Sequence, residues 1–180
     1  LGGIAKGYTS SRIMDIYREK GVTSGLVNLG GNAQVFGTKP DGSLWRVAVQ
    51  SPDSEDEYLG VLEAKDKAII TSGGYERYFE KDGVRYHHIL DPRTGYPADS
   101  GLMQVTIICD DSVIGDALST ACFVLGLDEG MKLAAKYGVN AIFVDTDKNI
   151  WYNNPDVLNY FEFTGKDSGY VLNEYNQARS

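Results

Sequence analysis

The chain has 180 residues, of which 42% are hydrophobic and 23% are charged, and it carries a formal net charge of −8 at pH 7. This length allows one domain to bury a core of its own, and no apolar stretch approaches the roughly 20 residues that a membrane-spanning helix requires. Binding to a nucleic acid needs clustered Lys and Arg, so the acidic balance argues against that partner. One mononucleotide or dinucleotide can still be held by backbone N–H groups, a single Lys or a metal ion.

The first part of the chain is predicted to form a helix followed by short strands. Apolar residues at helical spacing predict a helix over residues 4–20 that ends at Gly21. The apolar side chains able to share one face of it are Ile4, Tyr8, Ile13, Ile16 and Tyr17. Short β-type runs follow at residues 25–29, 33–37 and 44–50, and two more lie between residues 59 and 72.

The second part is predicted to combine hairpins and helices. Asp82 and Gly83 are typical of the turn between two paired strands, and residues 91–97, with two prolines and a glycine, form a loop. The elements expected after this loop are a buried strand at 103–109, a helix at 112–125 capped by Asp111 or Ser112, a helix at 128–137, a hairpin around 147–149 and a last strand at 157–163.

This order of elements predicts an α+β fold with largely antiparallel sheets and packed helices. We expect one domain over residues 1–165 and a polar, loosely held tail over residues 166–180. Cys109 and Cys122 each lie in an apolar run, which favours buried free thiols over a disulfide. They do not indicate a cellular compartment.

Three oxygen-bearing side chains share a face of the helix predicted at 112–125. Asp116, Ser119 and Thr120 lie at positions i, i+3 and i+4. One carboxylate with hydroxyls is an all-oxygen set that Mg²⁺ accepts, with water and substrate phosphates completing the coordination. The structural alternative is that Asp116 completes a helix cap or interacts with the helix dipole.

The two histidines, His87 and His88, are neighbours at the end of a predicted strand, just before Asp91-Pro92. Adjacent strand residues face opposite sides, so one ring can point into a cleft while the other packs. The rigid turn beside them favours proton transfer by one of them, although a structural histidine is the commoner case. Asp91 also has a structural interpretation, because Asp before Pro commonly starts a turn.

Glycine-rich segments occur at three places with polar neighbours. Gly2 and Gly3 would let the backbone approach a phosphate closely, and Lys6 adds one positive charge. The spacing is not that of a Walker A motif. Glycine pairs at residues 30–31 and 73–74 have similar surroundings. On a purely structural interpretation all three are turns, and Lys6 is solvated.

Five short motifs follow one another in the order LGGIAKGY, VNLGGN, TSGGYERYF, YHHILDPRTGYP and DALSTACFVLG. Together they resemble the ApbE family of FAD:protein FMN transferases, over residues 1 to about 145. The resemblance implies an ApbE-like architecture related to the T-fold. It also implies a Mg²⁺-dependent enzyme that uses FAD as its substrate.

The resemblance implies a role for seven residues. A backbone carbonyl that binds Mg²⁺ in the family falls on Gly3, and the metal ligands of the helix motif fall on Asp116 and Thr120, with Ser119 as a further contributor. An FAD contact falls on Lys6, and the hydrophobic residue that lies against FAD falls on Leu90. The histidine of the H-x-x-D-P pattern, expected to act as general base, falls on His88.

The activity implied is transfer of FMN from FAD to a Thr or Ser hydroxyl of an acceptor protein, with release of AMP. The acceptor is expected to carry a D-x-x-[ST]-G-A-[ST] type motif. Two alternatives stay open from the sequence: an FAD pyrophosphatase that uses water and gives FMN and AMP, and a non-catalytic flavin-binding protein.

Residue 1 falls inside the first motif, so we expect further sequence before it, including a flavin contact of the family. The metal side of the site is therefore expected to be more complete in this chain than the FAD side. By resemblance, the full-length form is expected outside the cytoplasm as a membrane-anchored lipoprotein. The sequence does not indicate an oligomeric state.

Overall fold

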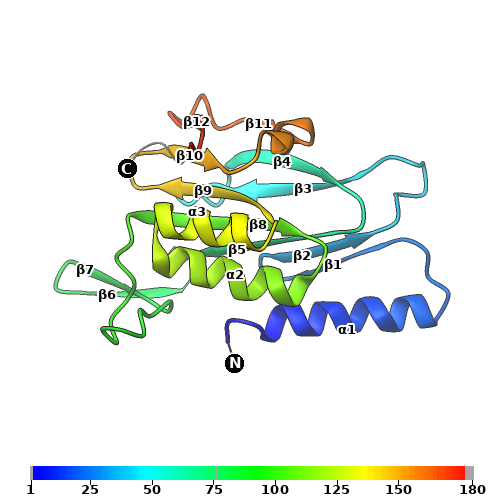
Figure 1. The fold of residues 1–180 in the computed structure, drawn as a ribbon, viewed down its shortest axis with the longest axis horizontal. Helices are drawn as coiled ribbons and strands as arrows, with labels where there is room; N and C mark the ends of the chain where they lie inside the picture. Colours follow the sequence, from blue (N-terminus) through cyan, green and yellow to red (C-terminus); the bar gives the residue numbers. More distant parts are fainter. Residues whose placement is uncertain (1, 76, 177–180) are drawn as a thin grey trace.

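The computed structural model describes residues 2–75 and 77–176. They form three layers, in which helices cover one face of a seven-stranded sheet and a three-stranded sheet covers the other (Figure 1). A separate two-stranded hairpin projects from one end of these layers. The α+β fold with largely antiparallel sheets that the sequence predicts is therefore confirmed.

The seven-stranded sheet has the order β1-β2-β5-β8-β9-β10-β12. All neighbours pair antiparallel except β10 and β12, which are parallel. Its strands are β1 (Gly25–Leu29), β2 (Asn32–Phe36), β5 (Lys67–Gly73), β8 (Leu102–Cys109), β9 (Asn140–Asp145), β10 (Asn149–Tyr152) and β12 (Val171–Glu174).

The two faces of this sheet carry separate cores because strand residues alternate in direction. On one face, Ile70 and Ile107 pack with Phe123 of helix α2 (Ser112–Leu125), and helix α3 (Leu127–Lys136) joins the same cluster. On the other face, Ile69 and Ile108 pack against the small sheet. Its strands, in the order β11-β4-β3, are β11 (Phe161–Phe163), β4 (Tyr58–Ala64) and β3 (Trp45–Gln50).

Helix α1 (Ala5–Glu19) forms where the sequence predicts it, but of the predicted apolar residues only Ile13 packs into the core cluster there, and none is fully buried. Its buried residues are Gly7, Ser10 and Met14, whereas Tyr8 is 59% exposed and Ile16 is 48% exposed. The small residues allow α1 to approach α2 closely, and the Ser10 hydroxyl hydrogen-bonds the Gln34 side-chain oxygen at 2.6 Å. Apolar spacing therefore predicted the helix correctly but not the face that is buried.

The hairpin consists of β6 (Tyr78–Lys81) and β7 (Val84–His87), paired antiparallel. Asp82 and Gly83 at its turn have φ values of 54° and 77°, so the predicted Asp-Gly turn is present. Beyond β7 the loop returns through an isolated bridge between Leu90 and Pro97.

The C-terminal part differs from the prediction in two places. Residues 155–159 form a 3-10 helix, η1 (Pro155–Asn159), because Pro155 suits a first helical position and the Asn154 side chain caps Asp156. Only β11 remains of the last strand predicted at 157–163. The segment expected to be a loose tail contains β12, and Tyr170 before it is 2% exposed.

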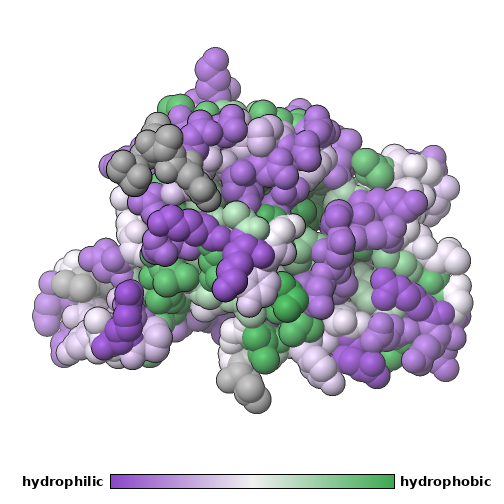
Figure 2. All heavy atoms as spheres, viewed as in Figure 1, coloured by the Kyte–Doolittle hydropathy of each residue, from purple (hydrophilic) through white to green (hydrophobic). Residues whose placement is uncertain are grey.

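Cys109 and Cys122 are buried free thiols, as predicted, and burial raises their pKa values to about 11 and about 12. Within residues 2–75 and 77–176, no helix is long and apolar enough to cross a membrane. On the face drawn in Figure 2, hydrophilic residues predominate and hydrophobic ones form separate patches.

Candidate functional site

A cavity of about 340 Å³ lies between the start of α1, helix α2, the end of β5 and the segment after β7. Six of the seven site residues predicted from the sequence line it: Gly3, Lys6, His88, Leu90, Asp116 and Thr120. Residues as far apart along the chain as Gly3 and Thr120, 117 positions, therefore meet at one place. The seventh, Ser119, does not line it.

Asp116 forms part of the helical side of the cavity and does not cap the helix. The cap of α2 is Asp111, whose side chain accepts hydrogen bonds from the backbone N–H groups of Val113 and Ile114. Asp116 is 3% exposed, and its Oδ2 accepts a hydrogen bond of 2.7 Å from the Gly7 backbone N–H. Asp116 therefore does not cap its own helix, but its carboxylate binds an N–H in the first turn of α1.

Gly7 fixes the distance between α1 and α2. A Cβ at this position would lie 2.2 Å from the Ser112 carbonyl oxygen and 2.7 Å from Asp116 Cβ. The Ser112 hydroxyl in turn donates to the Gly7 carbonyl at 2.8 Å. The two helices are thus joined by two hydrogen bonds at a contact that only glycine permits, and the Asp116 carboxylate is held by that contact.

Thr120 lies one turn further along α2, beside Gly3. The Thr120 Oγ1 is 3.8 Å from the position that a Cβ on Gly3 would take. On the other side, Ser72 of β5 lies within hydrogen-bond distance of both hydroxyls, 2.9 Å from Ser119 Oγ and 3.3 Å from Thr120 Oγ1. Ser119 is fully buried and donates to the Asp116 carbonyl at 2.9 Å. Its hydroxyl supports the wall of the cavity from behind.

These groups fit a magnesium ion better than a soft metal. Asp116 supplies a carboxylate whose described hydrogen bond uses only Oδ2, Thr120 supplies a hydroxyl, and Gly3 a backbone carbonyl. Within the described residues, no three His, Cys, Asp or Glu side chains come together as metal ligands. A site with one carboxylate and other oxygen donors leaves coordination positions for water and substrate phosphates, which is the usual mode of Mg²⁺ binding.

His88 is oriented by the hairpin. Its backbone N–H donates to the Arg77 carbonyl at 3.1 Å, and its ring Nδ1 lies 3.2 Å from the same oxygen. Because a carbonyl can only accept, Nδ1 carries a proton, so in the neutral ring the lone pair is on Nε2. His88 can therefore act as a base on the hairpin side of the cavity.

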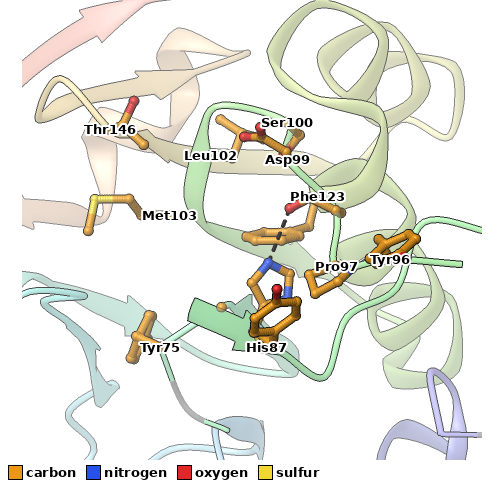
Figure 3. A pocket seen from close by; sticks show the side chains of 13 residues that line it. Tyr75, His87, Tyr96, Pro97, Asp99, Ser100, Leu102, Met103, Phe123 and Thr146 are labelled. Carbon is orange, nitrogen blue, oxygen red and sulfur yellow. Dashed lines mark hydrogen bonds between the residues drawn. The ribbon is translucent and has the colours of Figure 1, made fainter. Parts of the chain in front are cut away.

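His87 points to the other side of the segment, into a cavity of about 590 Å³ (Figure 3). Its Nε2 donates to the Ala98 carbonyl at 3.1 Å, its Nδ1 accepts from the Ile89 N–H at 3.3 Å, and its ring stands edge-on to Phe123. Desolvation lowers the pKa of His87, and the charge of His88 lowers it further, against the hydrogen bond to Ala98. The two rings face opposite sides, as the strand pattern predicts, but each of them lines a cavity, and burial favours the neutral form of His87.

Lys6 and Asp91 make hydrogen bonds between motifs and within a motif, respectively. The Lys6 Nζ donates to the Gly30 carbonyl at 2.9 Å, which joins the first glycine-rich segment to the turn at residues 30–31. Asp91 accepts hydrogen bonds from the backbone and side chain of Arg93, and this pairing holds the pKa of Asp91 below its usual value. Asp91 therefore has the structural role of shaping the loop.

Sequence reasoning missed three residues around the cavity: Gly7, Ser72 and Arg77. A glycine inside a helix costs about 1 kcal/mol relative to Ala, so its presence needs another reason, such as a close contact with a neighbouring element. Gly7 in the predicted helix could have been recognised by this signal. Ser72 and Arg77 lie in the motif TSGGYERYF, but no local pattern gives their side chains a role, because their partners lie elsewhere in the sequence.

The chain is similar to a known family of proteins. A model described as the ApbE family matches residues 1–143. A protein named FAD:protein FMN transferase from Klebsiella pneumoniae (strain 342) is 42% identical over 174 residues, covering 96% of this chain and 52% of the relative. One with the same name from Treponema pallidum (strain Nichols) is 39% identical over 160 residues, covering 83% and 44%.

Two solved structures resemble the fold. The ApbE protein from Thermotoga maritima MSB8 superposes with a TM-score of 0.75 at 38% identity, covering 93% of this chain and 52% of that one. The flavinyl transferase ApbE from Pseudomonas stutzeri, in its apo form, gives 0.68 at 40% identity, covering 79% and 44%. The chain thus spans about half the length of the relatives that it matches.

Proposed function

The chain belongs to the ApbE family, and on that premise we propose that it takes part in Mg²⁺-dependent transfer of FMN from FAD to a Thr or Ser hydroxyl of an acceptor protein, with release of AMP. The name FAD:protein FMN transferase, carried by the relatives, supports flavin transfer. The names of the relatives do not specify the Mg²⁺ requirement, the acceptor hydroxyl or the AMP product, and these three belong to our proposal.

The observation that carries the proposal is the convergence of a base and an oxygen-donor set on one cavity. His88 lies on its hairpin side, and Asp116 and Thr120 lie on its helical side, with Lys6 at the start of α1. A phosphoryl transfer requires this combination, because the attacking hydroxyl must lose a proton while charge develops on the phosphate oxygens.

In the proposed reaction, the proton and the leaving group both have a defined destination. His88 Nε2 takes the proton of the acceptor hydroxyl as that oxygen attacks the FMN phosphorus. A new P–O bond forms to the acceptor, and the P–O bond to AMP breaks opposite to it, so AMP leaves with the bonding electron pair. Mg²⁺ held by Asp116, Thr120 and the Gly3 carbonyl would supply electrostatic stabilisation of the pyrophosphate.

Lys6 and Leu90 provide the FAD contacts of the proposal within this chain. Lys6 brings one positive charge to the pyrophosphate, and Leu90, 54% exposed, offers an apolar surface at the cavity edge. A water molecule in place of the acceptor hydroxyl would turn the same arrangement into an FAD pyrophosphatase.

Mass spectrometry separates these activities. The chain is incubated with FAD, Mg²⁺ and an acceptor domain containing a D-x-x-[ST]-G-A-[ST] sequence. We expect the acceptor to gain the mass of one FMN phosphoester, with AMP released in equal amount. Free FMN and AMP with an unchanged acceptor would replace the proposal by hydrolysis, and unchanged FAD would replace it by non-catalytic binding.

The partner and the location are further parts of the proposal. We propose that the acceptors are FMN-carrying redox subunits and that the full-length form acts outside the cytoplasm, attached to the membrane by a lipid. Sequencing of the complete gene and intact-mass analysis of the mature protein would test the anchor. A mature protein without a lipid would contradict it.

A further inference from the structure

Arg77 lines the cavity beside His88, and the mechanism above gives its side chain no task. It is exposed and lies just before β6, at the base of the hairpin. Lys6 and Arg77 are the basic residues of the cavity lining, and they come from different sides, since Lys6 lies on α1.

Arg77 differs from the other arginines whose side chains the structure describes. Each of those has a carboxylate within ion-pair distance, and these arginines are Arg12, Arg18, Arg46 and Arg93. Arg77 has no such ion pair within the described residues. In a protein with a net charge of −8, acidic partners are abundant, so an arginine left without one beside a base is available to an anionic ligand.

The backbone connects this cation to the base. The Arg77 carbonyl accepts the hydrogen bonds of the His88 backbone N–H and ring Nδ1, at 3.1 and 3.2 Å. The guanidinium and the imidazole therefore extend from two paired residues at the base of one hairpin. A phosphate bound by Arg77 would therefore lie on the side of the cavity that His88 also lines.

We propose that Arg77 binds the pyrophosphate of the substrate, on the phosphoryl group that is transferred, and stabilises the charge that grows there during transfer. A guanidinium suits this task because its N–H groups form two parallel hydrogen bonds to phosphate oxygens. The inference rests on the function proposed above and adds a residue from the hairpin side to it.

Arg77 and Asp116 should contribute to pyrophosphate binding in different ways. Asp116 and Thr120 act through a metal ion, whereas Arg77 contacts the anion directly and belongs to a different element. The affinity due to Arg77 should therefore persist when the metal is removed. Binding that depends on Asp116 should not.

Calorimetric titration with inorganic pyrophosphate, with and without Mg²⁺, tests this inference. Arg77→Gln should weaken binding roughly tenfold or more in both conditions, because hydrogen bonds to charged groups are lost. Arg77→Lys keeps the charge but loses the paired geometry, so it should give an intermediate loss. Lys81→Gln is the matched control, since it removes a positive charge from the exposed strand of the same hairpin outside the cavity lining.

Equal affinities of Arg77→Gln and Lys81→Gln would overturn the inference, and so would a wild-type chain that does not bind pyrophosphate. The transfer assay keeps this result apart from the proposed function. If the wild-type chain binds pyrophosphate through Arg77 but leaves the acceptor unmodified, the result supports the anion site and contradicts the proposed FMN transfer. If transfer occurs and Arg77→Gln leaves kcat unchanged, the role of Arg77 in the reaction fails alone.

Discussion

The two sides of the cavity are built in opposite ways. The helical wall, formed by Asp116 and Thr120 with the buried Ser119 behind them, belongs to the main domain and is joined to α1 through Gly7. The hairpin wall, formed by Arg77, His88 and Leu90, flanks a two-stranded sheet that is separate from both larger sheets. A two-stranded hairpin is marginally stable without further packing, and Phe79 on it is 61% exposed.

The difference indicates a division of tasks. The side-chain oxygens of Asp116 and Thr120 that suit a metal ion lie on a helix packed in the core, so their spacing is preorganised, as an ion with strict geometry requires. The base and Arg77 sit on an element that can adjust when substrates enter. Substitutions in the two walls should therefore have separable effects.

The largest effect is expected in the helical wall. Asp116→Asn keeps the shape and an acceptor for the Gly7 N–H but removes the charge, so Mg²⁺-dependent pyrophosphate binding should disappear and transfer should fall about 1,000-fold. Asp111→Asn is the matched control, because Asn still caps α2 while the same charge is lost. Similar activities of the two variants would refute the metal assignment.

Replacement of the base should affect transfer without affecting binding. His88→Gln removes the lone pair of Nε2, and transfer should fall about 100-fold or more, while pyrophosphate affinity stays close to that of wild type. Steady-state kinetics and calorimetry on the same preparation measure both quantities. A parallel loss of binding and transfer would place His88 in substrate binding and not in proton transfer.

The contact between α1 and α2 should show as a loss of stability. Gly7→Ala raises helix propensity, yet its Cβ would overlap the Ser112 carbonyl, so the free energy of unfolding should fall by about 2 kcal/mol. Thr9→Ala on the exposed part of α1 gains helix propensity and loses only a solvent-exposed hydrogen bond from Thr9 Oγ1 to the Ala5 carbonyl. Chemical denaturation compares them, and a Gly7→Ala variant as stable as wild type would contradict the close contact.

A smaller effect is expected from the hairpin turn. Gly83 and Gly21 both have φ of 77° and open space around a would-be Cβ, so Ala at either position brings strain of about 1 kcal/mol. Gly83→Ala should lower transfer a few-fold with little change in global stability, since the hairpin can open locally. Gly21→Ala should leave transfer unchanged. Equal transfer rates of Gly83→Ala and Gly21→Ala would contradict a role of the hairpin turn in transfer.

The smallest effect concerns His87 and pH. Its pKa in the folded protein is lowered from the ordinary 6.5, so the unfolded state binds the proton more readily. Its contribution to stability is complete above pH 6.5 and declines as the pH falls towards the folded pKa. Between pH 7 and pH 5, wild type should lose on the order of 1–2 °C more in Tm than His87→Asn, measured by thermal melting. An equal loss of Tm in wild type and His87→Asn would contradict the conclusion that burial lowers the pKa of His87.

The helical wall could be predicted from sequence because its residues are close along the chain. The i, i+3, i+4 spacing placed Asp116, Ser119 and Thr120 on one face, and the structure has that face turned towards the cavity at two of the three positions. Ser119 differs because β5 lies behind it, and its pairing with Ser72 depends on a contact across 47 positions of the chain.

The face of α1 could not be predicted in this way. Apolar spacing identified Ile4, Tyr8 and Ile16, but burial followed the small residues Gly7 and Ser10, whose hydrogen bonds to distant groups are invisible in a local pattern. The strand β12 was missed for a similar reason. A short polar segment becomes a strand because β10 offers an edge, and that edge exists only in the folded sheet.

The central claim is that one cavity brings the metal donors, the base and the phosphate-binding cations together. A crystal structure with Mn²⁺ and pyrophosphate tests it most directly, because the anomalous signal locates the ion. The account predicts a peak between the Gly3 carbonyl, the Asp116 carboxylate and the Thr120 hydroxyl, with phosphate oxygens towards Lys6 and Arg77. A peak or a pyrophosphate in the cavity lined by His87 instead would contradict it.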